Sequence, residues 1–205
     1  MRRSCLAAWL AVRAGRPRRR QPVAQLRLWL PAGASVQEPV LPPGYSLRGL
    51  CAGDEAGWCA LLDAARELGP WDLQRLRRQI DGGLVASTQR FVVAGGELVA
   101  CAGVYDRRCC GLPAWEIGWV AVHPAHRRRG LGRSVTAAAA LACGELAPRP
   151  VFLLTDDQRV AAIRTYLGLG FVPDCTGPGQ TARWRAILAR LGPRWGALLD
   201  RLPDA

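Results

Sequence analysis

Positions 123–135, HPAHRRRGLGRSV, combine three consecutive arginines with a Gly-x-Gly turn and the start of an alanine-rich run. The segment AWEIGWVAVHP before them predicts a strand that stops at Pro124, and LGRSVTAAAALACGEL predicts a helix that begins after the first glycine. The first N–H groups of a helix lack partners and the helix dipole adds positive charge, so a helix opening on such a turn can bind an anion. Gly130 and Gly132 let phosphate oxygens approach the main chain. This arrangement favours a phosphate site, with a solvated turn or a nucleic-acid contact as the alternatives.

The net charge of +12 suits a nucleic-acid partner, but the distribution of charge argues against one. All 28 basic residues are arginine, a bias typical of GC-rich coding sequence. Residues 1–35 carry eight arginines and no acid, whereas residues 36–205 carry twenty arginines against sixteen acids. No aromatic residue is interleaved with arginines 127–129 for base stacking. We therefore expect no nucleic-acid partner.

The eight cysteines and two histidines predict neither a disulfide framework nor a metal site, because no C-x-x-C pair occurs. Cys109 and Cys110 are neighbours in a loop-like segment, where we expect inert thiols, with a redox role as the alternative. No apolar run reaches the roughly 18 residues needed to cross a bilayer. The expected location is cytoplasmic, with no membrane partner.

Residues 1–43 are predicted to be a basic, disordered leader, because they show no sustained apolar period and end in Pro- and Gly-rich sequence. A start codon assigned too early, a targeting signal or a membrane attachment are the other interpretations. The folded domain is expected to occupy residues 44–205, with its core at 44–175 and a helical tail at 181–202.

From residue 44 the hydrophobic pattern alternates between strand and helix periods. Strands are expected at 45–50, 89–94, 97–106, 114–124, 151–157 and just after 171, and helices at 52–69, 71–80, 131–146, 158–168 and twice within 181–202. This order predicts an α/β (α+β) fold, a mixed, mostly antiparallel central sheet flanked by helices.

Two short motifs on these elements, VAVHPAHRRRGLG and AIRTYLGLGF, resemble the GNAT superfamily of acyl-CoA-dependent N-acetyltransferases over residues 44–175. The family's loop reads Gln/Arg-x-x-Gly-x-Gly/Ala, which Arg127, Gly130 and Gly132 match. Its next landmark is a helical tyrosine shortly before Gly-Phe, which Tyr166 and the pair at 170–171 match.

The resemblance implies a site for acetyl-CoA as co-substrate, with no metal. The loop would hold the pyrophosphate and the strand before it would pair with the pantetheine amides. The implied cofactor residues are Val120, Ala121, Val122, Arg127, Arg128, Arg129, Gly130, Leu131, Gly132 and Arg133. Many relatives carry asparagine where this chain has Arg159, seven positions before Tyr166, and often end in a β-hairpin where residues 181–202 are helical in pattern.

The resemblance also suggests two catalytic residues. Glu116 would be a general base, or else an exposed residue on a half-buried strand. Tyr166 would protonate the departing thiolate, or else be a core tyrosine. Trp71 and Trp115 are candidates for lining an acceptor pocket.

The implied function is direct transfer of an acetyl or short acyl group from coenzyme A to an amine. A non-catalytic protein that senses acyl-CoA or binds a partner through this fold is the alternative. The acceptor, a small molecule or a peptide, cannot be read from the sequence, and neither can acyl chain length or the existence of a homodimer.

Overall fold

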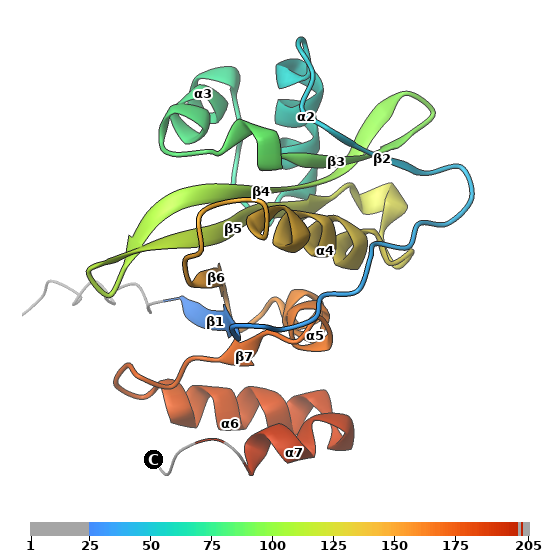
Figure 1. The fold of residues 1–205 in the computed structure, drawn as a ribbon. Helices are drawn as coiled ribbons and strands as arrows, with labels where there is room; N and C mark the ends of the chain where they lie inside the picture. The colour runs from blue at the N-terminus through green and yellow to red at the C-terminus, as the bar shows by residue number, and fades with distance from the viewer. Residues whose placement is uncertain (1–24, 201, 203–205) are drawn as a thin grey trace, which may run out of the picture.

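The structure is a computed structural model that describes residues 25–200 and residue 202. Its larger elements follow one another along the chain in an order that interleaves strands and helices (Figure 1). They are β1 (Leu26–Leu30), β2 (Ser46–Gly49), α2 (Glu55–Ala65), α3 (Leu73–Asp81), β3 (Arg90–Ala94), β4 (Glu97–Cys109), β5 (Leu112–Val122), α4 (Leu131–Cys143), β6 (Val151–Thr155), α5 (Val160–Gly168), β7 (Val172–Pro173), α6 (Gln180–Leu191) and α7 (Gly196–Leu199).

The strands form one seven-stranded sheet in the order β2-β3-β4-β5-β6-β1-β7. Every neighbouring pair is antiparallel except β5 and β6, which run parallel. The expected mixed, mostly antiparallel α/β fold is therefore confirmed.

Helices cover both faces of the central strands, and the sheet separates two apolar cores. On one face, α2 contributes Trp58 and Leu62 to a cluster that also contains Phe91 of β3. On the other, α4 contributes Leu131 and Val135 to the larger cluster, which Val92 of β3 joins from the opposite side of its strand. This alternation along β3 is the period expected of a strand buried on both faces.

The expectation of a leader up to residue 43 is wrong for the part of it that the structure describes. Residues 26–30, LRLWL, form β1, which lies between β6 and β7 and pairs antiparallel with both. Leu26 and Leu28 are fully buried, while Arg27 alternates with them. The remaining prediction of a basic tail, for residues 1–24, lies outside the described residues.

The segment that follows β1 packs along α4. Ser134 donates a hydrogen bond to the carbonyl of Val40 (2.5 Å), and Arg133 donates one to Gln37 Oε1 (3.2 Å). Val36 and Leu41 pack against the larger core. The domain therefore includes residues 25–43.

The expected helical tail is present as α6 and α7, separated by a 3-10 turn at Pro193–Trp195. Trp184 of α6 is fully buried and its indole N–H donates to the carbonyl of Asp174 (3.1 Å). Helix α6 therefore packs as part of the domain. Among the described residues, no helix combines the length and apolar character needed to cross a membrane.

Candidate functional site

The parallel strands β5 and β6 separate after a short paired stretch, and a cavity opens where they part. Only Trp115–Val151 and Glu116–Phe152 are paired in register, although β5 continues to Val122. A cavity of about 710 Å³ lies against the end of β5. Its lining consists of Ala65, Glu67, Leu68, Val120, Ala121, Val122, Arg127, Arg128, Gly130, Leu131, Gly132, Arg133, Asp156, Gln158, Arg159, Val160, Ala161, Ala162, Thr165 and Tyr166. Nine of the ten predicted cofactor residues are among them; Arg129 is not.

The turn before α4 forms part of the cavity lining. Gly130 precedes the helix in the left-handed region, with φ of +79°, and a side chain added there would meet nothing within 4 Å. Arg128 also has a positive φ, +62°. Leu131, Gly132 and Arg133 form the first turn of α4, so their N–H groups have no acceptor within the helix. These groups and the helix dipole favour a bound anion.

The arginine side chains around this turn are largely engaged by the protein. Arg127 donates to the carbonyl of Ala65 (3.2 Å) and to Glu67 Oε2 (2.8 Å). Arg133 donates to the carbonyl of Gly168 (2.7 Å). The guanidinium carbon of Arg129 lies 6.0 Å from the ring centroid of Tyr45. The main-chain amides, more than the guanidinium groups, therefore remain open to a ligand.

A β-bulge in β5 determines which side chains face the cavity. Between the pairs Cys101–Ala121 and Gly103–Gly118, β5 has one more residue than β4, and Trp119 takes a φ of +50°. Such an extra residue shifts the side-chain alternation by one. Val120 beyond the bulge therefore packs on the α4 side of the sheet.

The bulge puts Glu116 on the opposite face from Val120, although four residues of regular strand would place them together. Its neighbours in the strand, Trp115 and Ile117, belong to the α4-side core, so Glu116 points to the side of α2 and α3. Its side chain is 20% exposed and does not line the cavity. Burial raises the pKa of Glu116 above its ordinary value, and the Arg107 guanidinium, 3.1 Å away, works against that shift.

Tyr166 lies on the other side of β5. It projects from α5, is 6% exposed, and lines the cavity. Burial raises its pKa to about 12, with Arg159 acting in the opposite direction. The phenol is therefore protonated at neutral pH and is available as a hydrogen-bond donor. Glu116 and Tyr166 thus lie on opposite faces of the sheet.

Three charged residues of the cavity lining, Glu67, Asp156 and Arg159, were not predicted as site residues. Arg159 donates to the carbonyl of Glu67 (2.8 Å) and pairs with Asp156 (2.9 Å). One feature of the sequence indicated Arg159, because it occupies the position at which many relatives of the resembled family carry asparagine. Glu67 carried none, because only the fold brings the end of α2 to the loop after β5.

An aromatic cluster lies beside the bulge on the Glu116 side. The rings of Trp71 and Trp119 meet edge to face at 4.7 Å, and the Arg75 guanidinium lies 4.2 Å from the Trp71 centroid. Trp119 also donates to Gln79 Oε1 (3.1 Å). Trp115, the other candidate for an acceptor pocket, packs into the α4-side core.

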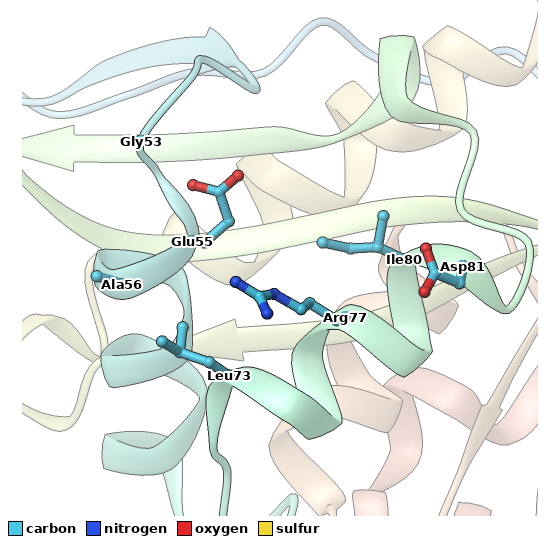
Figure 2. A pocket seen from close by; sticks show the side chains of 7 residues that line it. All are labelled: Gly53, Glu55, Ala56, Leu73, Arg77, Ile80 and Asp81. Carbon is cyan, nitrogen blue, oxygen red and sulfur yellow. The ribbon is translucent and has the colours of Figure 1, made fainter.

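A second, smaller hollow of about 500 Å³ lies between α2 and α3. Arg77 extends from α3 toward the start of α2, with Glu55 across the gap (Figure 2). It contains none of the predicted site residues.

Comparison with known proteins identifies the family of the domain that contains the larger cavity. The model of the acetyltransferase (GNAT) family matches residues 58–171, more than half of the chain. No curated protein matches the sequence.

Solved structures show the same fold. A GNAT-family protein from Novosphingobium aromaticivorans DSM 12444 matches with a TM-score of 0.52 and 24% identity, over 73% of this chain and 59% of that one. A GCN5-related N-acetyltransferase from Sphaerobacter thermophilus matches with a TM-score of 0.57 and 19% identity, over 82% and 53%. The ribosomal-protein-S18-alanine N-acetyltransferase from Escherichia coli matches with a TM-score of 0.51 and 18% identity, over 62% and 76%. The chain therefore spans less than two thirds of the first two proteins.

Proposed function

The chain belongs to the GNAT acetyltransferase family, and we propose that it is an N-acetyltransferase that moves an acetyl or other short acyl group from coenzyme A to an amine. Acetyl transfer is the chemistry of the family. In the proposed reaction the acyl group passes directly from the thioester to the amine, without an acyl-enzyme intermediate.

The cavity beside the end of β5 is the proposed site for the donor, acetyl-CoA. In the proposal, the N–H groups of residues 131–133 hold the pyrophosphate, because they open a helix and have no acceptor within it. The end of β5, at Val120–Val122, is not paired with β6 and can hydrogen-bond to the pantetheine amides as an added strand would. Arg127, Arg128 and Arg133 add positive charge around the pyrophosphate.

Glu116 and Tyr166 serve the two proton transfers in the proposed reaction. An ammonium acceptor must lose a proton before its nitrogen can attack the thioester carbonyl, and the carboxylate of Glu116 takes that proton, directly or through water. The new C–N bond forms as the C–S bond breaks, and the nitrogen then releases its second proton to solvent, from which the Tyr166 phenol is restored after each turnover. Tyr166 gives its proton to the sulfur, a role that suits a phenol kept protonated by burial.

The placement of the two residues supports this division of roles. Tyr166 lines the cavity proposed for the donor, whereas Glu116 lies on the opposite face and is partly exposed there. The donor and the amine would thus reach β5 from different sides. The opening between β5 and β6 is the observation on which the proposal depends most.

Release of thiol from acetyl-CoA over a panel of amines tests the proposal. The panel contains peptide N-termini, lysine peptides, amino sugars and polyamines; peptide N-termini are included because the Escherichia coli neighbour is named for an alanine N-terminus. Glu116→Gln keeps size and polarity and should lower kcat by about 10²–10⁴-fold at neutral pH. Tight binding of coenzyme A with no turnover of any amine would instead support the non-catalytic alternative.

A further inference from the structure

Arg107, on β4, is held in one conformation by contacts to three parts of the molecule. Its Nε donates to Glu116 Oε2 (3.1 Å), and its Nη1 donates to the carbonyl of Gly82. Its guanidinium carbon lies 5.0 Å from the ring centroid of Tyr105. An arginine that is already fixed by other contacts loses little side-chain conformational entropy when it also binds a carboxylate.

The loop after α3 is built to approach this arginine. Gly83 has a φ of +112°, and a Cβ added there would lie 2.9 Å from Arg107 Nη1 and 2.8 Å from the carbonyl oxygen of Asp106. The same loop pairs with β4, because the N–H of Asp106 donates to the carbonyl of Gly83 (2.7 Å). Arg107 therefore joins the α3 loop, β4 and Glu116.

Within the part of the chain that the structure describes, Arg107 is the charged group that acts on the pKa of Glu116. Tyr105 and Arg107 are the titratable and charged side chains that face it from β4, and Phe152 is its register partner on β6. Glu116 Oε1 lies 3.7 Å from the position of a Cβ at Gly118, and the Tyr105 ring lies 3.2 Å from the same position. Burial also keeps the pKa of Tyr105 above its ordinary value, so the phenol stays neutral and Arg107 supplies the compensating charge.

We propose that Arg107 is a positioning residue for Glu116. Arg107 holds the Glu116 carboxylate beside the bulge and favours its unprotonated form, and so sets the pH above which the transfer proceeds. This inference rests on the proposed function, because Glu116 is the base only in that reaction.

Two opposing effects act on the carboxylate. Burial favours the protonated acid, which cannot accept a proton from the amine, and the guanidinium favours the carboxylate. Loss of the guanidinium leaves burial unopposed, so the pKa of Glu116 rises further and the unprotonated fraction at low pH falls. Activity should then be lost mainly on the acidic side of the profile. A purely structural tie between β4 and the α3 loop would lower activity equally at every pH.

The first experiment compares the pH dependence of kcat/KM for the full chain and its variants with one acceptor, so that the acceptor's own ionisation contributes equally. Arg107→Met keeps an apolar stem against Tyr105 but removes the charge. Its loss of kcat/KM should be roughly tenfold larger near pH 6 than near pH 9, because only the unprotonated carboxylate can act as the base. Arg107→Lys keeps the charge and should leave the profile near that of the unmodified chain. Arg108→Met is the control, since Arg108 is exposed and donates to the carbonyl of Gly111 at the hairpin turn.

The second experiment follows the protonation of Glu116 without catalysis. The chain contains only six glutamates, so each carboxyl carbon can be resolved by NMR after side-chain labelling of glutamate. The signal that disappears in Glu116→Gln identifies the carboxyl group of Glu116. In Arg107→Met its titration should move to higher pH. This titration can be made even if no amine is acetylated, an outcome that would refute the proposed function and not the Arg107–Glu116 linkage.

An unmoved titration in Arg107→Met, or an equal loss of kcat/KM at all pH values, overturns the inference. If that variant does not fold, Arg107→Gln, which keeps a hydrogen-bond donor for Gly82 or Glu116, takes its place under the same criteria.

Discussion

Glu67 and Arg127 form an ion pair beside the proposed coenzyme site, with 2.8 Å between Oε2 and Nη2. Both residues line the cavity, so a carboxylate occupies one guanidinium that an anionic ligand could use. Glu67→Gln removes this competitor and a negative charge. We expect coenzyme A to bind roughly two- to fivefold more tightly, the range set by an exposed ion pair. Calorimetric titration measures it, and weaker binding would mean that Glu67 positions Arg127 for the ligand.

Gly132→Glu should abolish coenzyme A binding, because it places a negative charge in the first turn of α4, where the pyrophosphate is proposed to lie. Gly132→Ala is the control, because it adds a side chain at this position without a charge. A Cβ at this position would meet Val122 Cγ2 at 3.5 Å, an ordinary contact, so this variant should fold with an unchanged Tm. Unchanged affinity in a folded Glu variant would refute the phosphate site.

Tyr166→Phe should lower kcat and leave the affinity for acetyl-CoA nearly unchanged, because the proposed proton donation occurs in the transition state. Since the pKa of Tyr166 is raised to about 12, its ionisation should contribute no basic limb to the rate profile below about pH 10. Full kcat in the variant, with chemistry shown to be rate-limiting, would exclude the acid role.

Asp174 should make stability depend on acid pH. Burial alone would raise its pKa, but hydrogen bonds from Thr176, Arg27 and Trp29 outweigh burial and hold it below the ordinary value. A depressed pKa in the folded state stabilises the protein above the unfolded-state pKa, and this contribution is lost as the pH falls through the folded-state value. The Tm difference between the unmodified chain and Asp174→Asn should be largest at neutral pH and shrink below about pH 3. Thermal unfolding across this range measures it.

Removal of residues 1–40 should prevent stable folding, because it deletes β1 from the interior of the sheet. Leu28→Ala tests the same strand with one change and should cost about 2–5 kcal/mol, since Leu28 is fully buried. Denaturant unfolding of both proteins gives the free energies. Val40→Ala, at an exposed position of the same segment, is the control.

The sequence predicts the strand, glycine turn and helix around residues 123–135 well because these elements are consecutive along the chain. Strand β1 shows that local signals can also mislead: LRLWL alternates as a strand should, but its basic neighbours suggested a leader. Its partners, β6 and β7, were both expected as strands, but they lie far along the chain and no local pattern marks their pairing with β1. The same holds for the contact of Arg159 with Glu67 and for that of Arg107 with Gly82, which only the fold creates.

The place of β1 in the sheet also affects the order in which the protein can fold. The hydrogen-bonded side chains of Gln25 and Asp156 are 131 positions apart, so β1 leaves the ribosome long before its partners. At about 5–20 residues per second, the apolar strand waits on the order of ten seconds with both edges unpaired. Such long-range pairing slows folding and leaves strand edges open to aggregation. The sheet can therefore close around β1 only after residues 151–173 have emerged.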